Sequence, residues 1–513
     1  MTQLNSSRSL ISGPQVRQRG WIYQALGVEP IINCVGTQTN YGGSQPSQAV
    51  VNAMAAAAEA FVDLDELAEG VGRRLSILTD AGWGIVTSGS TAALSLATAA
   101  CLAGNDPELM LQLPYLTGTN RLVLIPKEHR FEYDRIMAVV GAEVRDFSDL
   151  NDLMYQVNLK PRMICMLGRA ILQGVGPALE DVRKAVGRVP IVVDAAGLSP
   201  QSPDPWLKRG ADLVIYSGGK FLRGPQSTGF LLGREDLCRA AWVNGSPHQS
   251  FGRAMKVGKD EIIGALAALE DWLLARSENE DQAKWERVLT SIEEKTATLG
   301  LETEILNATS SVLAPRLRIT WGSQHHCTAD QVRHLALTKH RVRFPDFWSR
   351  GEAIEINPFN MVGDEDVDRV VECLRDIFCQ QNPTSDTVSE KEKDHIDRDV
   401  SGTWRVSIEF LGRHRGDEFH LRQNKGQISG THRSHSSIGQ ISGELSSEEI
   451  ILKTCHESKP LSIYYSFRGA LTGGSICGEL TVGAASDEHR GLSLCSQFGL
   501  ATFHAERIRR LEA

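Results

Sequence analysis

No stretch of the sequence holds about 18 consecutive apolar residues, so we expect no membrane-spanning helix. The first residues, MTQLNSSRSLISGPQ, lack the apolar core of a signal peptide, and we therefore expect a cytoplasmic protein. An excess of positive charge is also missing. The formal net charge is −9, which argues against a nucleic-acid partner, although a local basic patch would be compatible with it.

The ten cysteines lack the C-x-x-C spacing that marks many metal and redox sites. Most of them lie in apolar runs, for example Cys101 in ATAACLAG and Cys165 in MICML. Buried free thiols in a reducing compartment are the simplest interpretation, and we assign no metal ligands.

The 513 residues, 41% hydrophobic and 23% charged, indicate a soluble protein of two or three domains. Residues 1–30 suggest an N-terminal arm with a short helix. From 31 to 260, helical segments alternate with short apolar strands such as RLVLIPK, MICMLG, PIVVDAA and LVIYSGG. One long segment, 49–78, is helical in period throughout. The alternation predicts an α/β domain with a mostly parallel sheet that helices cover on both faces.

Three further regions follow this domain. Residues 261–380 continue a run of long helices that starts at 259 and then mix strands and helices, which predicts a small α+β domain. Residues 381–400 are polar and charged, as in a linker. Residues 401–513 alternate with period two, which predicts about eight strands in an accessory antiparallel β-barrel or sandwich. Its repeated G-x-I-x-G pattern is expected to relieve crowding at strand bends.

Small and polar residues follow several strands of the α/β region, at the edge where open parallel sheets bind ligands. The first group is VTSGSTAAL, 86–94. Its small residues leave main-chain N–H groups free at a helix N-terminus, and the hydroxyls of Ser88, Ser90 and Thr91 add donors, which suits a phosphate. An N-capped helix that binds nothing explains this segment alone equally well.

Three chemically active residues follow other strands. Asp194 ends the strand in PIVVDAAG, where a buried carboxylate needs a partner such as a protonated ring nitrogen. Lys220 follows LVIYSGG, and a lysine held out of bulk water can lose its proton and attack a carbonyl. His129, in LIPKEHRFEYD, offers a flat ring that can stack on a planar cofactor. Taken singly, each residue also has an ordinary explanation: a capping or magnesium-binding aspartate, a surface lysine and a polar loop histidine.

In this order along the chain, a phosphate cradle, a ring-stacking residue, an aspartate and a lysine occur in pyridoxal-phosphate enzymes of the aspartate-aminotransferase fold. Residues 21–380 resemble the selenocysteine-synthase-like group of these enzymes, which includes D-glucosaminate-6-phosphate ammonia-lyase. The resemblance rests on the segments GVEPIINCVGTQTNYGGSQPS, FVDLDELAEGVGRRLSILTDA, VTSGSTAALSLATAACLAGNDP, IVVDAAG, GADLVIYSGGKFLRGPQSTGFLLGR and GRAMKVGKDEIIG.

The resemblance implies fold type I, with a large, mostly parallel seven-stranded sheet domain and a small α+β domain, and it implies pyridoxal 5′-phosphate as the cofactor. It further implies that Lys220 holds the cofactor covalently, that Asp194 contacts the pyridinium nitrogen and that His129 stacks on the ring. We expect Gly218 to let the main chain approach the cofactor. The other expected cofactor contacts are Ser88, Gly89, Ser90, Thr91, Ala196, Ser217 and Gly219.

On the substrate side, the resemblance singles out the segment INCVGTQTNYGG, for which a tight glycine turn with structural hydrogen bonds is the alternative. The loop 244–261 is a second candidate, with Lys256 and Lys259, or else a solvated basic loop. The expected substrate-binding residues are Asn33, Thr37, Thr39, Arg223, Gln226 and Arg253.

Two departures from the family pattern matter. The selenium transferases act on an aminoacyl-tRNA and carry an N-terminal domain for it, whereas here only a short arm precedes an acidic chain, so we expect no tRNA. Related folds often place a carboxylate-binding arginine where this chain has Glu355 and Asn357. The remaining candidates for an anion anchor, each also explicable as a solvated or salt-bridged side chain, are Arg223, Arg316, Arg318 and Arg343.

The predicted enzyme binds a small-molecule substrate whose amine displaces Lys220 from the cofactor, and the freed lysine then removes the Cα proton. Loss of a group from Cβ would give a keto acid and ammonia, and the family favours this lyase reaction on a hydroxy- or phosphosugar-type amino acid. If the proton returns to the other face of Cα, the enzyme is a racemase or epimerase. If the proton returns to the cofactor, the enzyme is a transaminase.

A non-catalytic relative with a ligand-binding β domain is the alternative from another class. An unused site, however, has no need for both Asp194 and Lys220. We also expect a homodimer or a higher homo-oligomer, since related enzymes complete each site with residues of a partner subunit.

Overall fold

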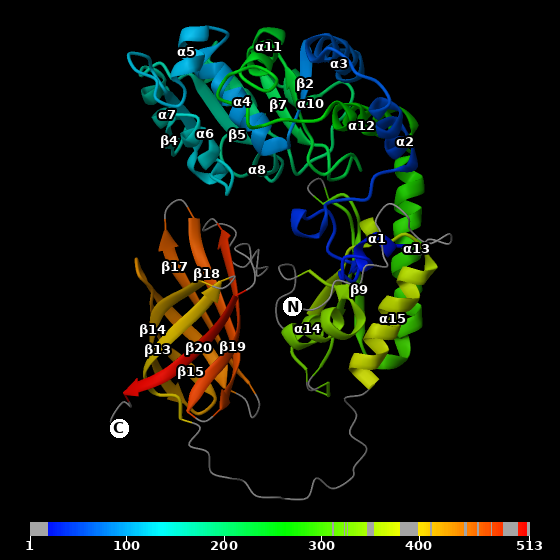
Figure 1. Cartoon of the computed structure of the whole chain (residues 1–513), viewed down its shortest axis with the longest axis vertical. Helices are drawn as coiled ribbons and strands as arrows, with labels where there is room; N and C mark the ends of the chain where they lie inside the picture. The colour runs from blue at the N-terminus through cyan, green and yellow to red at the C-terminus, as the bar shows by residue number, and fades with distance from the viewer. Residues whose placement is uncertain are drawn as a thin grey trace, which may run out of the picture. The chain divides into compact units, whose positions relative to one another are not determined.

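The computed structural model describes residues 19–309, 312–322, 324–325, 327–345, 353–379, 399–410, 413–445, 449–458, 461–472, 474–485 and 501–509. They form two compact units (Figure 1). The first, here called the N-terminal unit, contains nearly all described residues from 19 to 379, and the second is a C-terminal barrel.

A seven-stranded sheet forms the centre of the N-terminal unit. Five of its strands, from β7 to β4, pair in parallel, whereas β8 is antiparallel to both β7 and β2. Residues of β2, β3 and β8 are buried along the whole strand, which requires helices on both faces and explains their continuous apolar sequences. The mostly parallel sheet is thus confirmed. Its order is β2 (Trp83–Thr87), β8 (Gly229–Gly233), β7 (Leu213–Ser217), β6 (Ile191–Asp194), β5 (Met163–Leu167), β3 (Leu122–Pro126) and β4 (Glu143–Phe147).

Helices connect these strands and cover the sheet (Figure 1). In the N-terminal unit they are α1 (Trp21–Gln24), α2 (Gln48–Ala58), α3 (Leu64–Thr79), α4 (Ser90–Ala103), α5 (Pro107–Gln112), α6 (Arg135–Val139), α7 (Leu150–Val157), α8 (Gly168–Leu172), α9 (Leu179–Val186), α10 (Pro205–Lys208), α11 (Glu235–Val243), α12 (Lys259–Glu270), α13 (Glu278–Thr296), α14 (Ala329–His340) and α15 (Asp364–Cys379).

Two helical segments differ from the sequence prediction. The continuous helix expected over 49–78 is broken between α2 and α3, because the side chain of Asp63 accepts hydrogen bonds from the amides of Asp65 and Glu66 and so starts a new helix. The long helices expected from 259 are interrupted as well. A π-helical turn at Asp271–Ala275 ends α12, and Ser277 caps α13.

The small subdomain of the N-terminal unit is built on a three-stranded antiparallel sheet in the order β12 (Ala353–Ile356), β10 (Arg316–Thr320), β9 (Glu302–Leu306). Helices α13 and α15 supply much of its apolar core. Ile32 and Cys34 belong to the same core, because β1 (Ile32–Asn33) pairs in parallel with β11 (Val342–Arg343). Residues 32–34, which were expected in the large domain, therefore pack with the small one.

The C-terminal unit is a closed antiparallel barrel of eight strands, which decides between the barrel and the sandwich. Side chains alternate between a buried interior and the outer surface, as in β13. Its interior is filled by apolar side chains that include Trp404, Phe419 and Phe467. The strands are β13 (Gly402–Phe410), β14 (Arg413–Asn424), β15 (Gln427–Arg433), β16 (Ile438–Leu445), β17 (Ile450–Ser458), β18 (Leu461–Thr472), β19 (Ser475–Ala485) and β20 (Ala501–Arg509).

A chain of polar side chains lies among these apolar ones. Nε2 of His432 is 2.8 Å from Oδ2 of Asp417, Nε2 of His456 is 2.9 Å from Nδ1 of His432, and Nδ1 of His456 is 2.7 Å from Oγ of Ser437. Gly439 lies between the two histidines on β16, where a Cβ would stand 2.6 Å from the His456 ring. The same Cβ would stand 2.4 Å from Oγ1 of Thr454 and 2.5 Å from the carbonyl oxygen of Cys455, so this glycine of the repeated pattern relieves crowding between the strands, and its place at a strand bend stays a prediction.

Within the described residues, no helix is long and apolar enough to cross a membrane. In the same part of the chain, no group of three or more His, Cys, Asp or Glu residues is placed to hold a metal ion. The free thiols of Cys34, Cys101, Cys165, Cys238, Cys327 and Cys373 are buried, while Cys379 and Cys477 are exposed.

Candidate active site

The carboxyl ends of three neighbouring parallel strands bring the predicted residues to one edge of the sheet. Leu167 at the end of β5 pairs with Asp194 at the end of β6, which in turn pairs with Ile215 of β7. Ser217 ends β7, and Lys220 follows three residues later. Open α/β sheets build their ligand sites at this edge.

Asp194 is only 7% exposed. Its Oδ1 accepts a hydrogen bond of 2.9 Å from the amide of Ala196, so Ala196, predicted as a cofactor contact, positions this carboxylate. Burial raises the pKa of the Asp194 carboxyl, while the Ala196 amide and the charge of Lys220 act in the opposite direction. A buried carboxylate of this kind is matched by a protonated ring nitrogen.

Lys220 lies in the loop between β7 and β8 and is half-buried. Burial lowers the pKa of its amine, the carboxylate of Asp194 opposes this, and the charge of Arg169 lowers it further. The charges of Lys220 and Asp194 thus act on each other at this edge of the sheet, and their joint catalytic role stays a prediction. A lysine with a lowered pKa is the form that acts as nucleophile and base near neutral pH.

The glycines before Lys220 are needed by the protein's own packing, and their predicted approach to the cofactor stays a prediction. A Cβ on Gly218 would lie 2.2 Å from Oγ1 of Thr228, and one on Gly219 would lie 2.4 Å from Cα of Gln226. The amide of Gly218 also donates to the carbonyl oxygen of Thr228. Both glycines are therefore required by the close approach of residues 226–228, whatever they contact in a cofactor.

The predicted phosphate cradle is the N-terminus of α4. Gly89 precedes the helix with φ +92°, and no side chain caps the helix at this residue, so its first N–H groups point outward without an intrahelical partner. Ser88, Ser90 and Thr91 are half-buried around it. Gly229 of β8 pairs with both Thr87 and Ser217, which brings the end of β7 within two strands of this turn.

His129 departs from the expected picture. Its side chain is fully buried, its Nδ1 accepts a hydrogen bond of 3.1 Å from the amide of Leu167, and its Nε2 lies 2.8 Å from the carbonyl oxygen of Val175. Burial lowers the pKa of His129, which fits a neutral ring with the proton on Nε2. The histidine thus ties the end of β5 to the following turn, and ring stacking stays a prediction for the cofactor-bound protein.

The segment from Asn33 to Ser44 forms a hydrogen-bonded turn. The Asn33 side chain accepts from the amides of Val35 and Gly36 and donates to the carbonyl oxygen of Gly36, which is the structural alternative considered for this asparagine. Gln226 donates from Nε2 to the carbonyl oxygen of Thr39 over 2.9 Å. Asn33 and Gln226 therefore shape the site rather than present free amides, and Thr37 lies half-buried in the same segment.

Most of the arginines predicted to anchor an anion are engaged elsewhere. Arg223 donates to the carbonyl oxygen of Phe359 over 2.9 Å and lies over its ring. Arg316 and Arg318 both bind the buried carboxylate of Glu355. Arg343 donates to the hydroxyl of Tyr41, and Arg253 is exposed. The pairing with Glu355 explains why an acidic residue stands where an anion-binding arginine was expected.

The sequence interpretation missed two residues of the site. Arg169 is the second residue of α8, two residues after β5, and its charge acts on Lys220. Its signal was present, since an arginine two residues beyond the strand MICML lies at the ligand-binding edge. Ser44 donates both its amide and its hydroxyl to the carbonyl oxygen of Gly219. No local pattern announces this contact, because it joins positions 175 residues apart.

Similar proteins were found by comparing both sequence and structure. No protein-family model matches the chain. The chain is 30% identical over 284 residues to a 5′-C-glycyluridine monooxygenase-decarboxylase of a Streptomyces species, in an alignment that covers 52% of this chain and 69% of that protein. It is also 30% identical over 263 residues to the D-glucosaminate-6-phosphate ammonia lyase of Salmonella typhimurium, in an alignment that covers 49% of this chain and 70% of that protein. A solved structure of D-glucosaminate-6-phosphate ammonia-lyase matches with a TM-score of 0.62 and 26% identity, over 70% of this chain and 98% of that chain.

The chain belongs to the D-glucosaminate-6-phosphate ammonia-lyase family of pyridoxal-phosphate enzymes. The predicted fold type I is confirmed with it, and pyridoxal 5′-phosphate is the cofactor that this family implies. The residues present fit that cofactor. The uncapped start of α4 suits its phosphate, the buried Asp194 suits its ring nitrogen, and Lys220 suits its covalent attachment.

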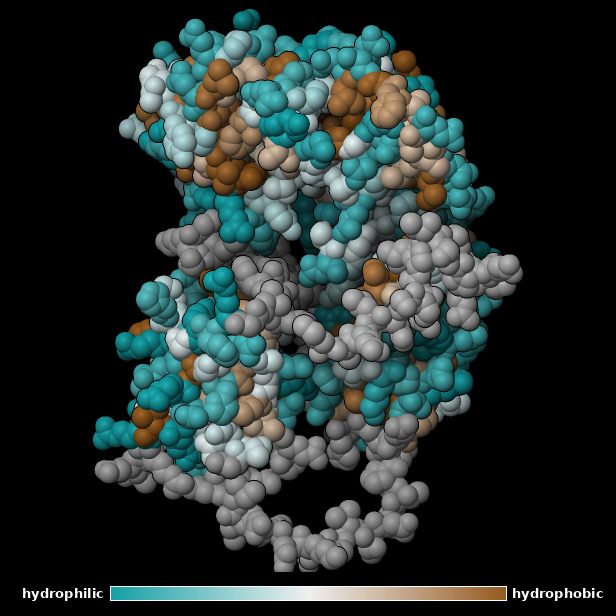
Figure 2. Space-filling view, viewed as in Figure 1, coloured by the Kyte–Doolittle hydropathy of each residue, from teal (hydrophilic) through white to brown (hydrophobic). Residues whose placement is uncertain are grey.

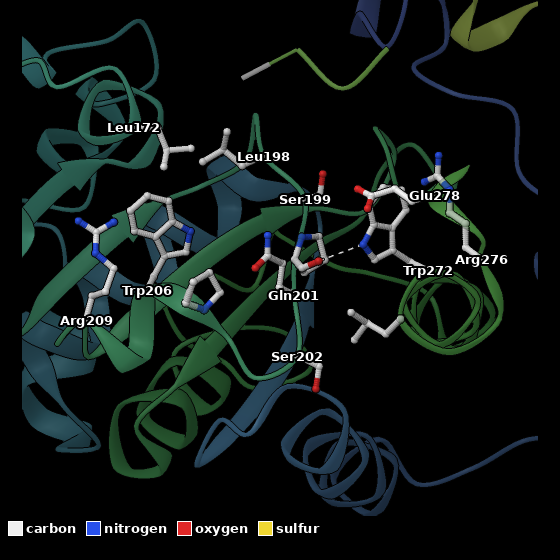
Figure 3. Close-up of a pocket in the computed structure, with 13 residues that line it drawn as sticks. Leu172, Leu198, Ser199, Gln201, Ser202, Trp206, Arg209, Trp272, Arg276 and Glu278 are labelled. Carbon is white, nitrogen blue, oxygen red and sulfur yellow. Dashed lines mark hydrogen bonds between the residues drawn. The ribbon is translucent and has the colours of Figure 1, made fainter. Parts of the chain in front are cut away.

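A pocket of about 520 Å³ is lined by residues of α8, α10 and the segments 198–202 and 272–278 (Figure 3). Neither Lys220 nor Asp194 lines it. Trp272 donates from Nε1 to the carbonyl oxygen of Pro200, the dashed line in Figure 3. Arg276, 3.8 Å from the centroid of the Trp272 ring, donates to the carbonyl oxygen of Phe221. One wall of the pocket therefore contacts the residue that follows Lys220.

Proposed function

We propose that the protein is a lyase for a small amino acid or amino-sugar acid, which loses its Cα proton and a Cβ substituent. The enamine that remains is hydrolysed by water to a keto acid and ammonia. The observation that supports this best is the half-buried Lys220 with its lowered pKa beside the buried carboxylate of Asp194. This arrangement keeps an amine ready to accept a proton at the edge of the sheet where substrates bind.

Each residue has one task in this proposal. When bound, pyridoxal phosphate supplies an electron sink for the electron pair left at Cα. The Nζ atom of Lys220 takes the Cα proton. The negative charge of Asp194 would stabilise the proton on the ring nitrogen of the cofactor. This role requires the carboxylate to point at that nitrogen. The free N–H groups at the start of α4 hold the phosphate.

The elimination is supported by the relative named ammonia lyase, whereas the relative of equal identity is named a monooxygenase-decarboxylase. We therefore separate the reactions by experiment. The purified holoenzyme is incubated in D₂O with D- and L-serine and with D-glucosaminate 6-phosphate, and keto acid, ammonia, Cα deuterium, O₂ uptake and CO₂ are followed. Keto acid with ammonia supports the lyase, and deuterium exchange without either supports a racemase or epimerase. O₂ uptake with CO₂ release points to oxidative decarboxylation.

Attachment of the cofactor is tested independently of the substrate. Borohydride reduction followed by mass spectrometry is expected to fix pyridoxal phosphate on Lys220, and the Lys220→Ala variant should remain unlabelled. A protein that contains no pyridoxal phosphate and gains no mass would remove the basis of the proposal.

We propose further that the protein is a cytoplasmic homo-oligomer. Its buried free thiols suit a reducing compartment. Apolar side chains interrupt the hydrophilic surface over the upper part of Figure 2, where Figure 1 draws the helices of the large subdomain. Around α2, Val51 is 46%, Phe61 98% and Val62 51% exposed. A surface of this kind favours a partner subunit. Light scattering of the wild type and of the Phe61→Ser variant tests the proposed oligomer. A monomeric mass for both proteins would refute it.

A further inference from the structure

Arg169 stands at the carboxyl edge of the sheet on the far side of Asp194 from the phosphate cradle. The strand order β2-β8-β7-β6-β5 puts the start of α4 and Ser217 at one end of the site, with Asp194 next and Arg169 beyond it. The turn that carries Arg169 is packed against Asp194, because a Cβ on the preceding Gly168 would lie 3.1 Å from the Asp194 carbonyl oxygen. The guanidinium is half-buried.

Its position separates Arg169 from the anion sites of the cofactor. The phosphate cradle contains no arginine in the described turn 88–91 and lies two or more strands away. The arginines predicted as substrate anchors are bound to Glu355, Phe359 or Tyr41, or are exposed. Arg169 was not among those predicted arginines, and its charge, unlike theirs, acts on Lys220.

We propose that Arg169 binds the α-carboxylate of the amino acid while its amine reacts at Lys220. The inference rests on the proposed function, since it supposes an amino-acid substrate. A guanidinium offers two parallel N–H donors that match both oxygens of a carboxylate. With one end of the substrate held by Arg169 and the amine directed at the lysine, the position of Cα is fixed between them, as proton removal by Nζ requires.

A second effect follows from the same position. A fixed positive charge near Lys220 disfavours protonation of its amine, so the free amine is present at lower pH than it would be beside Asp194 alone. When a carboxylate neutralises Arg169, the amine becomes easier to protonate. Binding of the acid and proton uptake by Lys220 are thereby coupled, which favours proton removal only when a substrate is present.

The test compares ligands that differ by the carboxylate alone. Wild-type, Arg169→Gln and Arg169→Lys holoenzymes are titrated with serine and ethanolamine, and with alanine and ethylamine, using the change in cofactor absorbance as the binding signal. The exposed Arg145 on β4 provides a control, Arg145→Gln. Wild type and control should prefer the acid in each pair. Arg169→Gln should lose about 10- to 100-fold of that preference, the size expected for a charge-assisted hydrogen bond, and Arg169→Lys should keep part of it.

Two results would overturn the proposal: an unchanged preference in Arg169→Gln, or a wild type without preference for the acid. Each can be told apart from failure of the enzyme proposal. If borohydride fixes the cofactor on Lys220 in every variant, the lysine site is intact and only the role of Arg169 is wrong. If it does so in none, the lysine site itself is wrong. Deuterium exchange without ammonia release would contradict the proposed lyase reaction but leave the proposed carboxylate contact of Arg169 standing.

Discussion

Ser44 holds Gly219, the residue before Lys220, by two hydrogen bonds to one oxygen. Its amide and its hydroxyl lie 3.1 and 3.0 Å from the carbonyl oxygen of Gly219. The turn that carries Ser44 is held in its own place, because Nδ2 of Asn360 donates to the carbonyl oxygen of Gly43 over 3.0 Å. The lysine loop is therefore fixed, through the 38–44 turn, by the small subdomain.

Two adjacent glycines in this turn allow a matched test of that contact. Both have positive φ, +87° at Gly42 and +72° at Gly43, so alanine strains either position by about 1 kcal/mol. Only at Gly43 would the new Cβ meet the carbonyl oxygen of Gly219, at 2.6 Å, whereas nothing lies within 4 Å at Gly42. Gly43→Ala should reduce Cα deuterium exchange about 10- to 100-fold, and Gly42→Ala should not. Equal rates would show that the turn does not position Lys220.

The role of Asp194 can be separated from the effect of burying any carboxylate. Asp194→Asn removes the charge that is predicted to lie opposite the ring nitrogen, and Cα deuterium exchange should fall about 100-fold or more while the protein stays folded. Asp204 is the control, since it is 1% exposed and accepts a hydrogen bond of 2.7 Å from Tyr216. Asp204→Asn should lower the melting temperature without this loss of exchange. A similar loss in both variants would assign the effect to folding.

The small subdomain contains a buried ion cluster whose loss should be costly. Glu355 is fully buried between Arg316, 2.7 Å away, and Arg318, 2.9 Å away. Glu355→Gln leaves the buried Arg316 charge without its counterion, and protection of β10 and β12 in hydrogen exchange should fall by about 3 kcal/mol. Glu304, 64% exposed and 3.5 Å from Arg318, is the matched control, for which Glu304→Gln should cost less than about 0.5 kcal/mol. Equal effects would contradict the cluster.

The parts of the site that could be predicted from the sequence are those that depend on local pattern. Asp194 is the last residue of one apolar strand and Lys220 follows the next strand by three residues, and parallel strands bring such residues to one edge. The roles of the arginines were harder to predict. An arginine that binds a substrate anion differs from one in a salt bridge only in the group that faces its guanidinium. Glu355 lies 39 residues from Arg316 in sequence and directly across from Arg318 in the β10–β12 pairing. Ser44 was missed for the same reason, since its partner is remote.

For the fold, too, the features that depend on local pattern could be predicted, and those that depend on remote pairing could not. Period-two alternation and the count of strands predicted the C-terminal β domain, but closure depends on β20 pairing with β13 across the whole domain. Continuous apolar strands predicted the parallel sheet, but the antiparallel direction of β8 follows from the short loop after β7. The break between α2 and α3 depended on one capping aspartate within a helical pattern.

The chain of polar side chains in the barrel makes its stability sensitive to acid. Burial lowers the pKa of His456 from 6.5 to about 4, with the charges of His432 and Arg415 acting in the same direction. For Asp417, burial acts to raise the pKa, but the hydrogen bonds from His432 and Arg415 lower it overall. Both groups therefore bind protons more tightly in the unfolded chain, and the barrel should lose stability as the pH falls below about 6.5.

For His456 alone, the loss between pH 6.5 and about 4 is on the order of 3 kcal/mol. Hydrogen exchange of peptides from β15 and β17, corrected for the intrinsic rate at each pH, measures it in the full chain. His456→Gln keeps a donor toward Nδ1 of His432 and removes the titrating ring, so its pH dependence over this range should be flatter. His420→Gln, on the exposed face of β14, should leave the slope unchanged. If His456→Gln shows the same pH dependence of stability as the wild type, another group in the barrel takes up the protons. If the stability of the wild-type barrel does not depend on pH in this range, the predicted acid sensitivity is wrong.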